Sequence, residues 1–186
     1  MTCDIHGECN NWNNPWNPTI NHLKRGTGCP KCAIERNELS NCLKHPKQFK
    51  NGRILYFITF KNLSTNKLFY KIGVTKEEKG VKGRFTKYRL KKDNIEIIKS
   101  EEIITTNINA LISEYWALQN FNKYRKYMLH VLKESNGGTE CFSKNICEIM
   151  SLKDIIRKSS NNFKNTLKDF DLTDTEKNNA LIEFKK

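Results

Sequence analysis

The chain has 186 residues, of which 37% are hydrophobic and 28% are charged, so we expect one main hydrophobic core with a smaller appendage. No apolar run approaches the roughly 18 residues that a membrane span needs, and the first residues do not resemble a secretory signal. We therefore expect an intracellular chain whose 7 cysteines stay reduced.

The charge of the chain is strongly positive, with 33 Lys+Arg against 20 Asp+Glu and a formal net charge of +13. Its densest part is the segment 71–92, which holds nine basic and two acidic residues. Such a local excess attracts polyanions through Coulomb steering and counterion release. It predicts a nucleic acid as partner.

Four potential zinc ligands stand near the N-terminus in two pairs of matching spacing. Cys3 and His6 are separated by two residues, as are Cys29 and Cys32, and 22 residues lie between the pairs. This spacing is typical of a four-ligand structural zinc site. We therefore predict a zinc-binding module over residues 1–40.

The same segment resembles a small zinc module of phage proteins, in which a treble-clef-like knuckle leads into a helix. The resemblance is carried by Cys3, His6, Gly7, Pro18, His22, Leu23, Gly26, Gly28, Cys29, Pro30 and Cys32. Cys9 and His22 remain rival ligands on spacing alone. Trp12 and Trp16 are expected to supply the apolar cover that so small a module needs.

The middle of the chain predicts alternating strands and helices. The polar residues 41–52 are expected to form a linker and turn. Aliphatic and aromatic residues then alternate over 53–60 and again over 68–74, which predicts a β-hairpin. A short helix over 84–90 and a third strand over 94–106 follow. The last element, over 107–121, has the wide apolar face of a buried helix.

The remaining residues, 144–186, predict a helical extension. Helices are expected over 146–158 and 163–170, and Thr173 with Glu176 forms a capping box that announces a last one. Three cysteines, Cys42, Cys141 and Cys147, have no partner spacing and are expected to be buried as small hydrophobic side chains.

Short motifs in the middle segment resemble those of the GIY-YIG nuclease superfamily, in a phage-associated branch with Lys-Ile-Gly as second motif. They are Leu55, Tyr56 and Phe57; Tyr70, Lys71, Ile72 and Gly73; Arg84; Glu114; and Thr139, Glu140, Cys141 and Phe142. The resemblance implies an α+β nuclease domain over residues 53–143, with a small antiparallel three-stranded sheet flanked by helices.

The resemblance also implies a role for each motif residue in phosphodiester hydrolysis. Glu114 is expected to bind Mg²⁺ or Mn²⁺, because these ions prefer oxygen ligands. Arg84 can donate two parallel hydrogen bonds to phosphate oxygens. Tyr56 and Tyr70 are candidates to orient or deprotonate the attacking water, provided that nearby cations lower a phenol pKa. Contacts to the DNA backbone are expected from Lys71, Lys76, Lys82, Lys87 and Arg89.

Several assignments stay open at this stage. Lys71 occupies the place of the tyrosine directly before Ile-Gly, so the general base can be Tyr56 or Tyr70, and both tyrosines can also be ordinary strand aromatics. Glu140 can be a structural hydrogen-bond acceptor or a site residue. Asn136 is the nearest candidate for the asparagine that is common near the end of such domains.

The expectation from the sequence is therefore a two-part DNA endonuclease. A structural Zn²⁺ module assists DNA binding, and a GIY-YIG-like domain cuts the backbone with Mg²⁺ or Mn²⁺. The alternative is a non-catalytic DNA- or RNA-binding regulatory protein on the same fold. Either would act in the cytoplasm of a bacterial or virus-infected host cell.

Overall fold

The computed structural model describes residues 38–49, 51–128, 131–133 and 138–184, and near the N-terminus the backbone of four two-residue strands. By its backbone contacts the chain divides into two compact units, Met1–Asn41 and Cys42–Lys186. None of the described helices is long and apolar enough to cross a membrane.

In the first unit, the described backbone forms two small antiparallel pairs. Strand β1 (Thr2–Cys3) pairs with β2 (Gly7–Glu8), and β3 (Asn10–Asn11) pairs with β4 (Asn14–Pro15). The backbone therefore reverses direction between Cys3 and Gly7. The predicted zinc ligands His6, Cys29 and Cys32 lie outside the described residues, as do the rival ligands Cys9 and His22.

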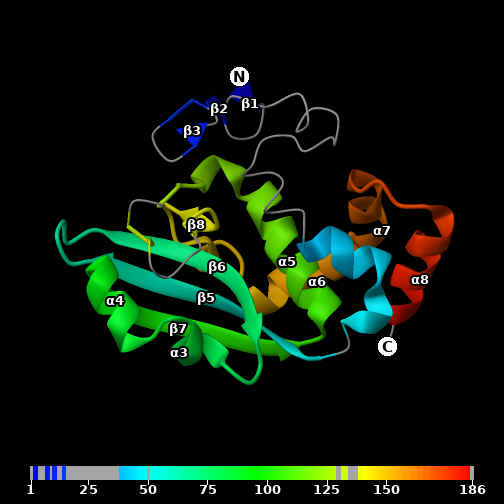
Figure 1. Cartoon of the computed structure of the whole chain (residues 1–186), viewed down its shortest axis with the longest axis horizontal. Coiled ribbons are helices and arrows are strands. Elements are labelled where there is room, and N and C mark those ends of the chain that lie inside the picture. Colours follow the sequence, from blue (N-terminus) through cyan, green and yellow to red (C-terminus); the bar gives the residue numbers. More distant parts are fainter. Residues whose placement is uncertain are drawn as a thin grey trace. The chain divides into compact units, whose positions relative to one another are not determined.

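The centre of the second unit is a four-stranded antiparallel sheet in the order β7-β5-β6-β8 (Figure 1). Strands β5 (Arg53–Asn62), β6 (Leu68–Lys76) and β7 (Ile95–Thr105) confirm the predicted hairpin and third strand. The fourth strand, β8 (Cys141–Phe142), pairs with β6 and was not expected. It has only two residues, which is too short for an alternating pattern to reveal.

The hairpin turn between β5 and β6 is built from its own polar side chains. The Asn62 Oδ1 accepts hydrogen bonds from the backbone of Ser64 at 3.0 Å and of Thr65 at 3.1 Å. Asn66 follows with a φ of 58°, a conformation that asparagine tolerates better than most residues. The turn of the predicted hairpin is therefore held by local side-chain hydrogen bonds.

One face of the sheet carries a core of aromatic and aliphatic side chains. Because side chains alternate along a strand, Tyr56 and Ile58 of β5 point to this face, where Val81 and Phe85 meet them. These two come from α3 (Gly80–Arg84) and the residue after it. A second helix, α4 (Lys87–Asp93), begins at the Thr86 N-cap, so the single helix predicted over 84–90 is two short ones.

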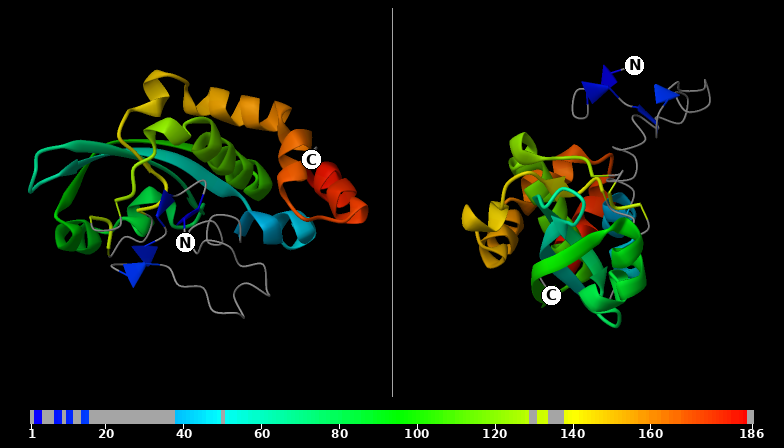
Figure 2. Two further views of the ribbon diagram at one scale, coloured as in Figure 1. Left: turned by 90° about the horizontal axis from the view of Figure 1, so that it is seen from above. Right: turned by 90° about the vertical axis from the view of Figure 1, so that its left-hand side faces the viewer.

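The opposite face of the sheet is covered by α5 (Asn107–Asn120), with α6 (Leu152–Asn161) outside it, as the left view of Figure 2 shows. Helix α5 agrees closely with the predicted range 107–121. Its buried side chains include Ile108, Leu111 and Ile112. At the contact between the two helices the hydroxyls of Ser113 and Ser159 share a hydrogen bond of 2.8 Å.

The C-terminal residues fold as helices, as predicted. They are the 3₁₀ turn η3 (Ile146–Glu148), α6, α7 (Phe163–Thr166), the 3₁₀ turn η4 (Leu167–Asp169) and α8 (Asp174–Phe184). The capping box is confirmed, because the Glu176 carboxylate accepts from the Thr173 backbone at 2.7 Å and the Thr173 hydroxyl accepts from the Glu176 backbone at 3.3 Å.

The segment expected to be a linker is partly helical. Residues 38–44 form an α-helix and Pro46–Gln48 forms the 3₁₀ turn η1. Within it, Cys42 and Leu43 are buried. Of the three cysteines expected to be buried, Cys42 and Cys141 are buried, whereas Cys147 is only half-buried. A further 3₁₀ turn, η2 (Asn122–Tyr124), follows α5.

Candidate active site

The candidate site is centred on Tyr56, whose ring lies across the backbone of Gly73. These two residues are directly opposite each other in the β5–β6 ladder, so their side chains share a face. A Cβ at position 73 would overlap the Tyr56 ring and hydroxyl. Gly73 is therefore required here because it leaves the space that the phenol occupies.

The phenol of Tyr56 is buried and is influenced by neighbouring charged side chains. Its side chain has no exposed surface, and its hydroxyl has no hydrogen-bond partner among the described residues. Burial raises the pKa of Tyr56 to about 12, although the charges of Lys71 and Arg84 act in the opposite direction. The cations do not outweigh burial, so the phenol keeps its proton at neutral pH. Tyr56 is thus equipped to donate a hydrogen bond.

Arg84, the last residue of α3, lies beside this phenol. Its Nη1 donates a hydrogen bond of 2.5 Å to the carbonyl oxygen of Val74 on β6. The guanidinium carbon is 5.7 Å from the centre of the Tyr56 ring. Arg89 in turn donates to the Arg84 carbonyl at 3.1 Å. The Arg84 side chain is half-buried and anchored to β6 by this hydrogen bond.

Glu114 lies in the third turn of α5, the helix that covers the opposite face of the sheet. It is half-exposed, and its negative charge contributes to raising the pKa of the Tyr56 phenol. No group of three or more His, Cys, Asp and Glu side chains is gathered for a metal within the described part of the chain. A single carboxylate suits Mg²⁺, which keeps several waters and takes only one or two protein carboxylates.

Lys71 is fully buried on the same face and forms an ion pair with Glu140, with 2.5 Å between Nζ and Oε2. Burial, the largest single effect, lowers the pKa of Lys71, but the Glu140 carboxylate together with Tyr56 and Cys141 outweighs it and holds the pKa above its ordinary value. The Thr139 hydroxyl donates to the other carboxylate oxygen of Glu140 at 2.6 Å. Because Lys71 has no exposed surface, it leaves the set of residues expected to contact DNA.

Tyr70 is not part of this cluster. It is adjacent to Lys71 on β6, and successive side chains of a strand point to opposite faces. Its ring instead stacks on Phe57 at 6.2 Å on the α5 side of the sheet. Of the two candidate tyrosines, only Tyr56 therefore lies with Arg84 and Glu114. Asn136 lies outside the described residues.

The other predicted DNA contacts are exposed. Lys76 ends β6, Lys82 is on α3, and Lys87 and Arg89 are on α4. On α4, Tyr88 is 65% exposed, and the Lys92 ammonium lies 4.9 Å from its ring centre. Exposed basic side chains can attract the phosphates of a nucleic acid, and an exposed aromatic ring can stack on its bases.

The sequence analysis did not predict the ion pair between Lys71 and Glu140, although the sequence contains an indication of it. Lys71 interrupts an otherwise apolar strand, and a buried ammonium needs a carboxylate partner. Glu140 stands 69 residues later, so only the fold could identify it.

Comparisons with known proteins leave the identity of the chain open. No protein-family model matches it, and neither a curated protein nor a solved structure shows significant similarity to it.

Proposed function

We propose that the chain is a DNA endonuclease that hydrolyses phosphodiester bonds with the help of Mg²⁺ or Mn²⁺. The observation that carries the proposal is that Arg84 lies 5.7 Å from the Tyr56 ring centre and that the charges of Arg84 and Glu114 both act on the Tyr56 phenol, although the three residues come from three separate elements. A hydrogen-bond donor, a guanidinium and a carboxylate in one place are the groups that hydrolysis of a phosphodiester requires.

Each of the three groups has a part in this proposal. The half-buried guanidinium of Arg84 binds a non-bridging oxygen of the scissile phosphate. The protonated phenol of Tyr56 is buried without a partner within the described part of the fold, so it donates a hydrogen bond to the attacking water or to the phosphate only when substrate binding opens a path to its hydroxyl. Glu114 holds the divalent ion, which when bound polarises the phosphate and its own waters.

The buried Lys71–Glu140 pair takes a supporting role. Its 2.5 Å contact joins β6 to the residue before β8, and the Lys71 charge acts on the Tyr56 phenol. A positive charge beneath the phenol strengthens it as a hydrogen-bond donor. Lys71 is thus a positioning residue, and the tyrosine that it replaces in the second motif is not needed as a base.

A zinc module is proposed for the first unit, with Cys3, His6, Cys29 and Cys32 as ligands. The antiparallel pairing that sets Cys3 opposite Gly7 is compatible with such a module. The module would add to DNA binding. Metal analysis of the purified chain should find about one zinc per chain, and its absence after refolding with zinc would contradict the assignment.

A second candidate function, a non-catalytic nucleic-acid-binding regulator, is favoured by one observation. The Tyr56 phenol has a raised pKa of about 12 and cannot serve as a general base without help. The exposed basic side chains of α3 and α4 would serve binding equally well in a protein that does not cut.

Plasmid cleavage with Mg²⁺ or Mn²⁺ separates the two functions. Wild-type protein should cut, Glu114→Ala and Arg84→Ala should not, and Arg84→Lys should fail to restore activity because lysine lacks the planar fork. Glu96→Ala and Arg157→Ala remove exposed charges elsewhere and should cut normally.

Two results would contradict the proposal. Retained cleavage in both Glu114→Ala and Arg84→Ala would overturn the site. Salt-sensitive binding by a wild type that does not cut would favour the regulator.

A further inference from the structure

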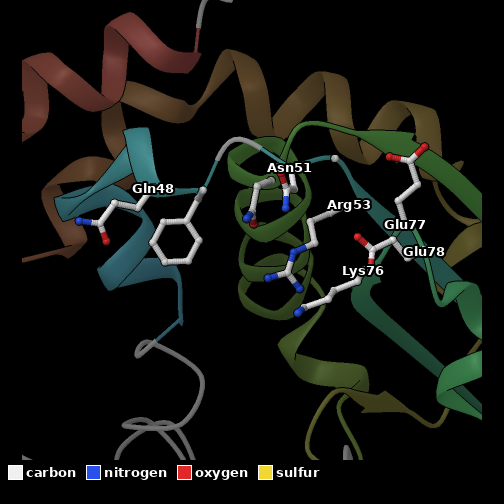
Figure 3. Close-up of a pocket in the computed structure, with 9 residues that line it drawn as sticks. Gln48, Asn51, Arg53, Lys76, Glu77 and Glu78 are labelled. Atoms are coloured by element: carbon white, nitrogen blue, oxygen red, sulfur yellow. The ribbon is translucent and has the colours of Figure 1, made fainter.

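A pocket of about 640 Å³ opens in the second unit where β5 begins, β6 ends and α5 begins. Figure 3 draws its lining residues as sticks and labels six of them, among them Arg53, Lys76 and Asn51. Its volume falls in the range of small-molecule sites. Arg53 is three residues before Tyr56, so it points to the opposite face of the sheet and lies about 10 Å along the strand. The pocket is therefore distinct from the candidate active site.

Two positive charges are held together on one wall of the pocket. Arg53 and Lys76 are directly opposite each other in the β5–β6 ladder. Figure 3 shows their charged ends extending side by side in the same direction. Like charges at opposed positions of a sheet repel each other, and an anion between them relieves the repulsion. A guanidinium next to an ammonium suits a phosphate group in particular.

The start of α5 adds to the attraction for an anion. The helix has 14 residues and no acidic residue in its first turn, so the partial positive charge of its N-terminus is not offset there. The Thr106 hydroxyl caps only one backbone amide, that of Asn109, at 3.3 Å.

Asn107, the first residue of α5, indicates a second group that a ligand of this pocket should carry. It lines the pocket and is only 4% exposed, and its Oδ1 accepts no hydrogen bond from any described residue. A buried acceptor without a donor is costly, so native proteins rarely leave one unmatched. Because the Oδ1 itself is covered, the Asn107 amide has to turn toward the pocket to meet a ligand donor such as a sugar hydroxyl.

Two further features restrict the chemical class of the ligand. The half-buried Phe49 gives the pocket an aromatic surface on which a base can stack. Glu77 and Glu78 also line it, and the Glu77 carboxylate lies against Gly52. Because these two carboxylates offset the charges of Arg53 and Lys76, the pocket suits one phosphate better than a polyphosphate chain.

We propose that this pocket binds a nucleoside monophosphate unit, either as a free nucleotide or as the phosphorylated end of a strand. Its phosphate lies at Arg53 and Lys76, its sugar donates a hydrogen bond to Asn107, and its base packs on Phe49. The inference does not depend on the proposed nuclease activity, because it concerns binding at another face of the sheet.

Calorimetric titration of the full chain, without added Mg²⁺ or Mn²⁺, tests the proposal. Adenosine 5′-monophosphate should bind saturably, and inorganic phosphate and adenosine should each bind at least about tenfold more weakly. Arg53→Gln and Lys76→Gln should each weaken nucleotide binding by about tenfold. Lys67→Gln, which removes an exposed lysine from the hairpin turn, should leave it unchanged.

Asn107→Ala separates the nucleotide from a bare anion. It should weaken binding of the nucleotide and leave binding of inorganic phosphate unchanged. Competition by an oligonucleotide with a 5′-phosphate, but not by the same oligonucleotide without it, would identify a strand end as the source; failure of both to compete would identify a free nucleotide. The proposal is overturned if the nucleotide does not saturate the protein, if phosphate alone binds as well, or if Arg53→Gln and Lys76→Gln bind like wild type.

Discussion

Replacement of Lys71 by methionine should destabilise the protein strongly. Methionine fills a similar volume but leaves the Glu140 carboxylate, only 16% exposed, without its cation. Removal of one partner from a buried ion pair costs about 3–5 kcal/mol. Because Glu140 retains some contact with water and a hydrogen bond from Thr139, we expect the lower end, about 3 kcal/mol.

A double-mutant cycle measured by urea unfolding isolates the pair. Glu140→Gln alone leaves the Lys71 ammonium buried and should also be costly. The double variant Lys71→Met/Glu140→Gln should lose much less than the sum of the two, with a coupling energy of at least about 2 kcal/mol. Lys99→Met breaks an ion pair of similar length, 2.7 Å, at an exposed position and should leave the unfolding midpoint unchanged.

The pH dependence of stability is an independent test of the Lys71–Glu140 ion pair. Burial opposes the Glu140 charge, but the charge of Lys71 and the hydrogen bonds from Lys71 and Thr139 together outweigh it and lower the pKa of Glu140 from its ordinary value of 4.5 to about 2. The stabilisation is therefore present above pH 4.5 and is lost as the pH falls toward 2. In Lys71→Met the buried carboxylate has a raised pKa instead. That variant should become more stable as the pH falls from 7 through this raised pKa.

Additive effects of the two single substitutions, within about 0.5 kcal/mol, would refute this account of the pair. A Lys71→Met variant whose stability follows pH in the same way as wild type would refute it as well. Either result would mean that Lys71 and Glu140 do not depend on each other in the folded protein.

Three further substitutions test the site and the fold. Tyr56→Phe removes a buried hydroxyl without a described partner, so it should raise the free energy of unfolding by about 1 kcal/mol while abolishing cleavage; a loss of stability would show that the hydroxyl is bonded in the native protein. Gly73→Ala places a methyl group into the Tyr56 ring and should cost about 1–3 kcal/mol in urea unfolding, and an equal cost in a Tyr56→Leu background would contradict the overlap. Thr173→Ala removes the cap of α8 and should lower stability by about 1 kcal/mol with cleavage unchanged, whereas a loss of cleavage would give α8 a role that the fold does not suggest.

The elements of the second unit were largely predictable because they follow local rules. The alternation over 53–60 and 68–74, the polar turn between them and the apolar face over 107–121 each depend on neighbours in the sequence. The capping box at Thr173 and Glu176 is equally local. The two-residue strand β8 and the helix in the expected linker were not predicted, because their pairing and packing involve partners far away in the chain.

The members of the candidate site were named from their motifs, but their arrangement was not predictable. The sequence left Tyr56 and Tyr70 as candidates for the base, with Tyr56 first, and placed Lys71 among the DNA contacts. Strand register bears on both points, since Tyr56 and Lys71 share one face and Tyr70 points to the other. A role as base required that nearby cations lower the pKa of the phenol. For Tyr56 this condition is not met, because desolvation of the phenol exceeds the effect of the cations.

The sequence by itself determined the order of the elements, the basic charge of the segment 71–92 and the residue types available for chemistry, because these depend on composition and short-range pattern. Only the tertiary structure decided which of the basic residues face solvent. In the fold, Lys71 is buried against Glu140, Lys82 and Lys87 are exposed, and Arg53 and Lys76 line a second pocket. Burial and cross-strand partners arise from contacts between distant residues, and these set the charge state and the accessible partner of each side chain.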